Sequence, residues 1–418
     1  MSCIVVEGRR RLEGSISVQT AKNGVLPVLA ATILNTGVTV IERCPKLSDV
    51  DVTISVLEGL GCQVHWEGDD LVVDASSADG TAISCELMHK MRSSVIFLGS
   101  LLGKMGRADI CLPGGCELGA RPIDIHVNAL EKMGAKFTSE DEIISCVVTR
   151  RTACELILPK PSVGATENIM LFAVTCKGTT RIINAAKEPE ISDLQDYLNA
   201  IGYRVKGAGS PVIEIEGKSE LPATYVRHRP IPDRIAAATW LCAGAMTGGT
   251  VELRSARPDH MKAALDALKE SGSMIHVQGD RITLIGPPRP KAIPRLKTSP
   301  FPGFPTDAQP LFFALASVSK GRTFIEETMF ENRFSFGPDL ARMGAGVFIR
   351  GKFAAIDGTS ELKGQSVVAK DLRGGAALVL AGLAAEGQTI IDQAGYIDRG
   401  YEHIEKTLAL LGASIWRT

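Results

Sequence analysis

Short runs in which hydrophobic and polar positions alternate recur along the chain, and each run begins with a glycine. Alternation with a period of two predicts a half-buried β-strand, and the preceding glycine is typical of a turn. The runs lie about 70 residues apart, a longer period than that of the common solenoid repeats. They span 37–41, 106–110, 178–182, 249–253, 321–325 and 387–391.

Each run is followed by a predicted amphipathic helix that ends at a glycine, a residue that adopts positive φ without strain. Two short strand-like segments and a second, largely apolar helix complete the repeat. The closing glycines are Gly61, Gly134, Gly202, Gly272, Gly344 and Gly412. The second helices are expected over 24–34, 92–102, 166–175, 233–245, 307–318 and 374–385. The pattern therefore predicts an α/β protein with six β-α-β-β-α repeats.

The sixth repeat lacks one strand, and the N-terminal run 4–8 resembles the missing partner. We therefore expect the N-terminal strand to complete the last repeat, so that the six repeats divide into three and three. The predicted domains are 22–230 and, for the second, 1–21 together with 231–418. The segment 227–232 has the composition of a linker. Two short crossings between domains favour a hinge that closes over a cleft.

Composition narrows the functional classes. The chain has 418 residues, of which 45% are hydrophobic and 22% charged, as in ordinary globular proteins. A net charge of −1 argues against a general nucleic-acid binder or a binder of acidic membranes. No run is long and apolar enough to cross a membrane, and no N-terminal signal segment is evident. The ten cysteines lack zinc-like spacing, so we expect free thiols, no metal and a cytoplasmic location.

Cys116 is the most informative single residue. It lies in the glycine-rich stretch Pro113–Gly119, with Arg121 five residues further on and His126 just beyond. A thiol near positive charge can have its pKa lowered into the reactive range. A buried structural cysteine is the alternative, and composition alone leaves both interpretations open. The stretch is about four residues longer than the equivalent turns, which favours an inserted lid that carries its own acid.

Basic residues stand at the start of several second helices, including Lys22, Arg92 and Arg373. Helix N-termini attract anions, so a cation there is unfavourable for the helix and points to a binding role. A solvated basic residue is the alternative at each single position. Their recurrence at equivalent positions indicates an anion-binding surface, for which bidentate arginine is well suited.

An ordered set of motifs extends over essentially the whole chain and resembles the enolpyruvyl transferases. The motifs include Ala21–Asn23, Met91–Ser94, Pro113–His126, Pro161–Thr166, Glu188–Glu190, Pro232–Ile235, Phe304–Asp307, Phe330–Phe334, Asp371–Arg373 and Asp398–Glu402. The resemblance implies a fold of two inside-out α/β barrels, each with three repeats.

The resemblance also implies a reaction. The enolpyruvyl group of phosphoenolpyruvate would pass to the 3′-hydroxyl of UDP-N-acetylglucosamine with release of phosphate, by addition and elimination through a tetrahedral ketal. This is the first committed step of peptidoglycan synthesis, and it needs no metal or organic cofactor. The partners would be these two small molecules, without nucleic acid or membrane.

The motifs carry the family's roles to particular residues. Cys116 would be the acid and Asp307 the base, with Lys22 and Arg399 as further catalytic groups. Phosphoenolpyruvate would contact Lys22, Asn23, Arg92, Arg121, Arg333, Arg373 and Arg399. The nucleotide sugar would contact Asn23, Arg92, Arg121, Pro122, Ile123, Asp124, Ile125, Ser162, Val163, Gly164, Thr306, Asp307 and Met329.

Small departures from the family pattern occur. Gly24 and Val25 replace the usual pair of alanines, and Ala236 replaces a frequent glutamate. Neither removes a catalytic group. Two alternatives remain: the sister enzyme that acts on shikimate 3-phosphate and lacks the cysteine-bearing loop, and a non-catalytic relative that only binds a nucleotide sugar.

Overall fold

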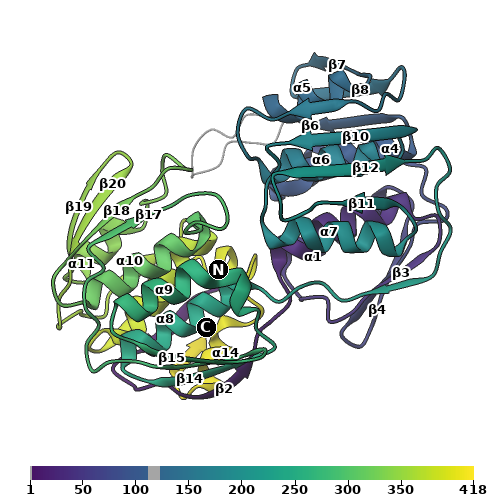
Figure 1. The fold of residues 1–418 in the computed structure, drawn as a ribbon. Coiled ribbons are helices and arrows are strands. Elements are labelled where there is room, and N and C mark those ends of the chain that lie inside the picture. The colour runs from purple at the N-terminus through teal and green to yellow at the C-terminus, as the bar shows by residue number, and fades with distance from the viewer. Residues whose placement is uncertain (1, 112–122) are drawn as a thin grey trace. The chain divides into compact units, whose positions relative to one another are not determined.

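The computed structural model describes residues 2–111 and 123–418, which form two compact units (Figure 1). One unit comprises residues 20–111 and 123–231, and the other comprises residues 2–19 and 232–418. Each unit has its own hydrophobic core. Cys116, Arg121 and Pro122 lie outside the described residues.

Six small sheets organise the strands, three in each unit. The unit that begins at residue 20 has the sheets β13(Val226–His228)-β3(Val38–Ile41)-β5(Asp70–Asp74)-β4(Gln63–Glu67), β6(Arg107–Cys111)-β8(Ile143–Val148)-β7(Ala135–Glu140) and β11(Arg204–Lys206)-β12(Val212–Gly217)-β10(Gly178–Ile183)-β9(Glu155–Ile157). The other unit has β15(Met274–Gln278)-β16(Arg281–Ile285)-β14(Thr250–Arg254)-β2(Glu13–Ser17), β17(Arg295–Lys297)-β18(Arg322–Glu326)-β20(Phe353–Asp357)-β19(Gly346–Arg350) and β21(Ser366–Val368)-β22(Gln388–Asp392)-β1(Ile4–Glu7)-β23(Ser414–Arg417).

The six-fold repetition and the α/β class are confirmed, but the predicted repeat is one strand too short. Five sheets carry an additional short strand that pairs in parallel with the first strand of a repeat, as β9 does with β10. In the remaining sheet an isolated bridge between Ala82 and Asp109 takes this place. The four of these strands outside the N-terminal segment have only three residues each, too few for alternation to reveal them. The described strands form six separate sheets, of which five are mixed and the three-stranded sheet β6-β8-β7 is antiparallel, and none of these sheets closes into a barrel.

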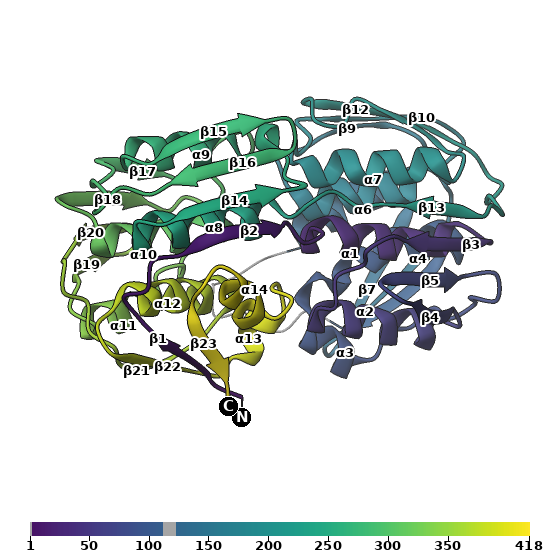
Figure 2. The ribbon, with the colours of Figure 1, turned by 90° about the horizontal axis from the view of Figure 1, so that it is seen from below.

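The N-terminal strand β1 lies between β22 and β23 and pairs with both in antiparallel register. Ile4 is opposite Ile391 on one side and Arg417 on the other. Figure 2 shows these three strands together near the chain ends. The sheet of the sixth repeat is therefore built from both ends of the described chain.

The outer helices have one apolar face, and each ends at a glycine with positive φ, as predicted. At Gly134, for example, φ is 101° and a Cβ would lie 1.7 Å from the carbonyl oxygen of Arg150. The outer helices are α2(Ser48–Gly59), α5(Asp124–Lys132), α7(Pro189–Ala200), α9(Lys262–Glu270), α11(Gly337–Arg342) and α14(Ile404–Leu410).

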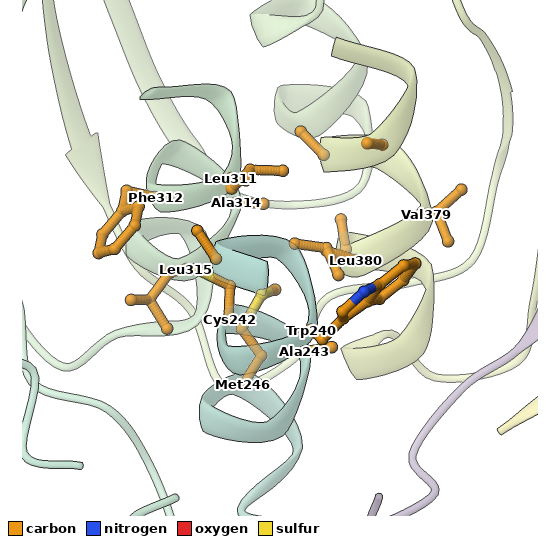
Figure 3. Packing of buried hydrophobic residues seen from close by; sticks show 14 of the residues in the cluster. Trp240, Cys242, Ala243, Met246, Leu311, Phe312, Ala314, Leu315, Val379 and Leu380 are labelled. Carbon is orange, nitrogen blue, oxygen red and sulfur yellow. The ribbon is translucent and has the colours of Figure 1, made fainter. Parts of the chain in front are cut away.

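The inner helices are apolar on nearly every side because they are covered on every side. Figure 3 shows Trp240 of α8 beside Leu380 of α12, in a cluster that also includes Leu311 of α10. The inner helices are α1(Lys22–Ala31), α4(Phe97–Lys104), α6(Val163–Ala173), α8(Arg234–Thr247), α10(Gln309–Val318) and α12(Leu372–Ala384). Shorter helices are η1(Thr32–Leu34), α3(Cys85–Lys90), η2(Arg92–Ile96), η3(Pro258–Met261), η4(Thr306–Ala308) and α13(Gly395–Asp398).

The expectation of free thiols is wrong for one pair. Cys85, the first residue of α3, forms a disulfide with Cys111, the last residue of β6, and their Cα atoms are 5.2 Å apart. The sequence gives no sign of this pair because its members lie 26 residues apart and meet only through the fold. No helix in the described part of the chain is long and apolar enough to cross a membrane.

Candidate functional site

Lys22 begins helix α1, and its ammonium group is already paired. Its Nζ lies 2.6 Å from Oδ2 of Asp49, in the first turn of α2, and both side chains are almost fully buried. A buried cation that keeps a carboxylate partner can stay charged away from water. Asn23, the next residue, is exposed. Asp49 could not be predicted from the sequence, because nothing near it in the chain marks it as a partner of Lys22.

The carboxylate of Asp193 supports the start of α1. Its Oδ1 accepts a hydrogen bond from Nε2 of His228 at 3.0 Å, and its Oδ2 accepts one from the backbone N–H of Ile231 at 3.3 Å. A Cβ at Gly24 would lie 2.8 Å from that same Oδ2. The glycine at position 24, a departure from the family pattern, therefore leaves room for this carboxylate beside Lys22 and Asn23.

A pocket of about 510 Å³ lies between α5 and β9. Asp124 and Ile125, two predicted contacts of the nucleotide sugar, line it together with the segment Leu156–Pro159. Its volume is within the range of small-molecule sites. Ile123 precedes α5 and is half-buried. Ser162 caps α6, which continues with Val163 and Gly164; the Ser162 hydroxyl accepts from the N–H of Ala165.

His126 links α5 to α6 beside this pocket. Its Nδ1 accepts a hydrogen bond from Nδ2 of Asn168 at 2.9 Å, and a Cβ at Gly164 would lie 3.0 Å from its Cε1. Burial lowers the pKa of His126 to about 4, so the ring is neutral at physiological pH. The neutral ring therefore acts as a packing and hydrogen-bonding element between the two helices.

Glu167, also on α6, has the opposite shift. Burial, reinforced by the charges of Glu190 and Glu188, raises the pKa of its carboxyl to about 8. At neutral pH this carboxyl is mostly protonated. The motif Glu188–Glu190 therefore comes close to a third carboxyl group, a relation that the sequence does not reveal.

In the other unit, Asp307 on η4 is held by two buried arginines. Nη2 of Arg333 lies 2.6 Å from its Oδ1, and Nη2 of Arg373 lies 3.3 Å from its Oδ2. Both guanidinium groups are almost inaccessible to solvent, whereas the Asp307 side chain is 30% exposed. The two arginines fix both oxygens of the carboxylate while one part of it stays open to a ligand.

Further contacts orient the arginines themselves. Arg333 donates to the carbonyl oxygen of Thr306 through Nε and Nη2. Asp371 caps α12 by accepting from the N–H groups of Arg373 and Gly374, both at 3.0 Å. Nη1 of Arg373 is buried and has no well-aligned acceptor among the described residues, although the guanidinium group also interacts with the side chain of Tyr401. An incompletely paired buried donor is costly, and an anionic ligand can complete its hydrogen bonding.

Glu327 joins two predicted contacts of the nucleotide sugar. The Thr306 hydroxyl donates to its Oε2 at 3.0 Å, and the N–H of Met329 donates to its Oε1 at 2.7 Å. Glu327 is 1% exposed, whereas the Met329 side chain is 44% exposed. Glu327 could not be predicted from the sequence, because it forms no motif of its own.

For the remaining predicted residues, the structure gives the position in the fold but few side-chain contacts. Arg399 is half-buried at the end of α13, directly after Asp398, which pairs with Arg417. Arg92 begins η2. Asp233 caps α8 by accepting from the N–H groups of Ile235 and Ala236, so the alanine at 236 leaves this cap intact. The described residues contain no cluster of three or more His, Cys, Asp or Glu side chains suited to a metal ion.

Solved structures of other proteins share this fold. Among solved structures, the enolpyruvyl transferase NikO from Streptomyces tendae superposes with a TM-score of 0.89 at 24% identity, over 100% of this chain and 99% of that one. An EPSP synthase from Acinetobacter baumannii superposes with a TM-score of 0.74 at 18% identity, over 100% and 99% of the two chains. At these identities the likeness establishes the fold.

Sequence relatives are closer. The family described as EPSP synthase (3-phosphoshikimate 1-carboxyvinyltransferase) matches residues 6–408. The chain is 47% identical over 412 residues to UDP-N-acetylglucosamine 1-carboxyvinyltransferase 2 of Caldanaerobacter subterraneus subsp. tengcongensis, covering 99% of this chain and 98% of that protein. It is 46% identical over 419 residues to UDP-N-acetylglucosamine 1-carboxyvinyltransferase 1 of Symbiobacterium thermophilum, covering 99% and 94%. The chain therefore belongs to the UDP-N-acetylglucosamine 1-carboxyvinyltransferases, within the wider EPSP synthase family.

Proposed function

We propose that the protein is an enzyme that transfers the enolpyruvyl group of phosphoenolpyruvate to the 3′-hydroxyl of UDP-N-acetylglucosamine and releases phosphate. Relatives named for this activity match at 42–47% identity over nearly the whole chain. The structural observation that carries the proposal is the Asp307 carboxylate, which is partly exposed and is held by the buried Arg333 and Arg373. A role in peptidoglycan synthesis follows from the identity of the product, UDP-N-acetylglucosamine that carries the enolpyruvyl group.

The reaction has two stages. In the addition, the 3′-hydroxyl oxygen bonds to C2 of phosphoenolpyruvate, its proton passes to a base, and a proton from an acid reaches the methylene carbon. In the elimination, that methyl group loses a proton and the bond between C2 and the phosphate oxygen breaks. The enzyme must therefore supply an acid, a base and cations for a substrate with phosphate and carboxylate charges.

Asp307 is the proposed base. The two arginines leave its carboxylate fixed in orientation, which places the accepting oxygen in advance of the reaction. Nη1 of Arg373 lacks a well-aligned acceptor, which supports a second role for that arginine as a donor to the substrate's carboxylate or phosphate. Arg333 is enclosed by contacts to Asp307 and Thr306, which favours a positioning role.

In the unit that begins at residue 20, Lys22, Asn23, Arg92 and Arg121 are the proposed contacts of phosphoenolpyruvate. Arg399 is proposed for the same substrate from the other unit. The pocket beside Asp124 and Ile125 is the proposed site of the nucleotide end of UDP-N-acetylglucosamine. Ile123, Pro122, Ser162, Val163 and Gly164 complete this set, and Thr306 and Met329 are proposed sugar contacts.

Cys116 is the proposed acid, and the other thiols provide a selectivity test. Burial raises the pKa of Cys62 to about 11 and that of Cys146 and Cys176 to about 12. Cys242 is also buried and its pKa is raised. We therefore expect an epoxide analogue of phosphoenolpyruvate to label Cys116 alone, faster when the nucleotide sugar is bound. Labelling spread over several cysteines, read by peptide mass spectrometry, contradicts this role.

Phosphate release from phosphoenolpyruvate tests the overall proposal. Release should require UDP-N-acetylglucosamine, should not occur with shikimate 3-phosphate, and should persist after chelation of metal ions. Dependence on shikimate 3-phosphate would assign the sister activity instead. Cys116→Ala should abolish turnover and leave binding of the nucleotide sugar nearly unchanged. An equal loss of binding and rate makes Cys116 structural.

We also propose a cytoplasmic location, because both substrates are metabolites of that compartment. Cell fractionation with an antibody against the protein tests this location. Recovery outside the cytoplasmic fraction argues against it.

A further inference from the structure

Glu327 follows strand β18 and departs from the backbone pattern of the repeats. In four other repeats, the residue six positions after the opening glycine has a positive φ, between 49° and 61°. Positive φ is uncommon for residues other than glycine, so its recurrence marks a turn that these repeats share. The four residues are Arg43, Asn184, Ser255 and Gln393. Glu327 takes the same position in the fifth repeat but does not share this conformation, and its N–H donates to the carbonyl oxygen of Lys352 at 2.8 Å.

The side chain of Glu327 departs from the pattern as well. Its four counterparts are half-buried or exposed, whereas Glu327 is almost completely buried. The neighbouring Glu326 pairs with Arg295 and Lys297, but among the residues that the structure describes no cation forms an ion pair with Glu327. Burying a carboxyl group is costly unless hydrogen bonds compensate for the lost water. The repeat alone therefore does not account for this burial.

Four hydrogen bonds to Glu327 join three segments of the chain. Its Oε1 accepts from the hydroxyl of Thr298 at 3.1 Å and from the N–H groups of Met329 at 2.7 Å and Phe330 at 3.2 Å. Its Oε2 accepts from the hydroxyl of Thr306 at 3.0 Å. Hydrogen bonds to a carboxylate are stronger than those between neutral groups. The side chain therefore ties the residue after β17 and the start of η4 to the segment that follows β18.

Two of these contacts lead to the proposed base, Asp307. Thr306 directly precedes Asp307, and its carbonyl oxygen accepts from Nε and Nη2 of Arg333. The ring centroid of Phe330 lies 5.3 Å from Cζ of the same arginine, which pairs with Asp307. Glu327 thus supports both the residue before the base and the aromatic ring that packs on the arginine orienting it.

We propose that Glu327 is a positioning residue for the enolpyruvyl transfer. The inference rests on the proposed function, in which Asp307 takes the proton of the 3′-hydroxyl and Thr306 and Met329 contact the sugar. At 1% exposure, Glu327 acts through these residues and not by contact with a substrate. None of its four donors is a proposed contact of phosphoenolpyruvate. Because a displacement of about 1 Å can cost about 100-fold in rate, a loosened η4 should affect the reaction strongly.

Glu327→Gln keeps the size of the side chain but places an amide donor where one oxygen accepted. In steady-state phosphate release, kcat should fall at least about tenfold and KM for UDP-N-acetylglucosamine should rise at least about threefold. KM for phosphoenolpyruvate should change less than about twofold. A smaller fraction of folded enzyme would lower the apparent kcat and leave both KM values unchanged, so the split identifies positioning. Glu326→Gln is the control and should match the wild type.

A double-mutant cycle tests the contact with Thr306. Thr306→Val removes the hydroxyl and keeps the shape of the side chain. If Glu327 acts through this hydroxyl, Glu327→Gln should lower kcat much less in the Thr306→Val variant than in the wild type. Equal effects in the two backgrounds overturn the inference.

Thr298 provides a test that does not depend on the folding of Glu327→Gln. Thr298→Val removes a donor to Glu327 at a residue that is not a proposed substrate contact, whereas Thr298→Ser keeps the hydroxyl. We expect the valine variant to raise KM for the nucleotide sugar and lower kcat relative to the serine variant. Equal kinetics of these two variants contradict the inference.

The wild-type assay separates this inference from the proposed function. A wild type that releases no phosphate with UDP-N-acetylglucosamine overturns the proposed function and the inference with it. An active wild type, together with a Glu327→Gln variant of unchanged kcat and KM values, overturns the inference alone.

Discussion

Each carboxylate oxygen of Asp307 pairs with a different buried guanidinium group. We expect these two ion pairs to affect both the reaction rate and the stability of the folded chain. Arg333 and Arg373 depend on the carboxylate for charge compensation. Removing one member of a buried ion cluster leaves the remaining charges uncompensated, which costs about 3–5 kcal/mol. A residue proposed as a base is therefore also a structural tie between η4 and α12.

Asp307→Asn tests both roles. We expect kcat, measured by phosphate release, to fall at least about 100-fold, because the amide cannot accept the proton. The free energy of unfolding, measured with urea, should fall by about 3 kcal/mol because the arginines lose their counter-charge. The control is Asp266→Asn, since Asp266 is half-exposed on α9 and remote from η4 in sequence. A variant with unchanged kcat argues against the proposed base.

His126 predicts a pH dependence of stability. Its pKa is about 4 in the folded chain against 6.5 when unperturbed, so the unfolded chain binds the proton more readily. The free energy of unfolding should therefore fall as pH decreases from about 6.5 towards 4, by up to about 3 kcal/mol from this group. Above pH 6.5 the contribution is fully present.

His126→Asn should flatten that part of the pH profile, because the amide oxygen can accept from Asn168 without binding a proton. Denaturant unfolding at several pH values measures the change. His65→Gln is the control, since the His65 side chain is 59% exposed. Equal slopes in the wild type and His126→Asn between pH 6.5 and 4 contradict the prediction.

Motifs in the sequence indicated Asp307, Arg333 and Arg373 individually but not their contact, because Arg373 lies 66 positions from Asp307 and only the fold brings them together. A motif also indicated Lys22, whereas its partner Asp49 was not indicated at all. Glu327 and Asp193 act through hydrogen bonds to backbone and side-chain donors, which no residue pattern encodes.

Among the secondary-structure elements, the outer helices end where a glycine permits a left-handed residue. This feature was readable from sequence because glycine, amphipathic periodicity and the following strand recur together six times. The three-residue parallel strands were not readable, since so short a segment shows no periodicity. The disulfide between α3 and β6 was not readable either, because a cysteine pair is defined by distance in the fold.

Two of these glycines allow the stability cost of backbone strain to be measured apart from the cost of a steric clash. Gly134 and Gly412 have similar φ values of 101° and 91°, but only at Gly134 would a Cβ meet another atom, the Arg150 carbonyl oxygen at 1.7 Å. Gly412→Ala should cost about 1–2 kcal/mol from the backbone conformation alone. Gly134→Ala should cost clearly more, since the backbone must also move. Equal losses in urea unfolding contradict the predicted clash.

The two units differ in how the chain forms them. The first is one stretch of chain, apart from the segment that the structure does not describe, and the second combines two separate stretches. All strands of the first lie between residues 20 and 231, whereas the second takes β1 and β2 from residues 2–19. Strand β1 is central in its sheet, so its loss would leave β22 and β23 without a common partner.

Fragments test this division. Residues 20–231 expressed alone should fold and unfold cooperatively, because their sheets and core are complete. Residues 232–418 alone should not, because two sheets each lack one strand. Adding a peptide of residues 2–19 should restore cooperative unfolding of the second fragment, observed by circular dichroism. A fragment 20–231 without a cooperative transition contradicts the predicted domain division.

The position of β1 in its sheet also affects the order in which strands can pair while the chain is synthesised. Among the described strands, β1 is synthesised before the others and has no partner until β22 and β23 emerge, nearly four hundred residues later. The unit ending at residue 231 can form in the meantime, as domains of nascent chains generally do in order of emergence. Throughout that interval Ile4, Val5 and Val6 lack the two strands that flank them in the folded protein, so we expect the nascent chain to expose an apolar segment until its last strand is made.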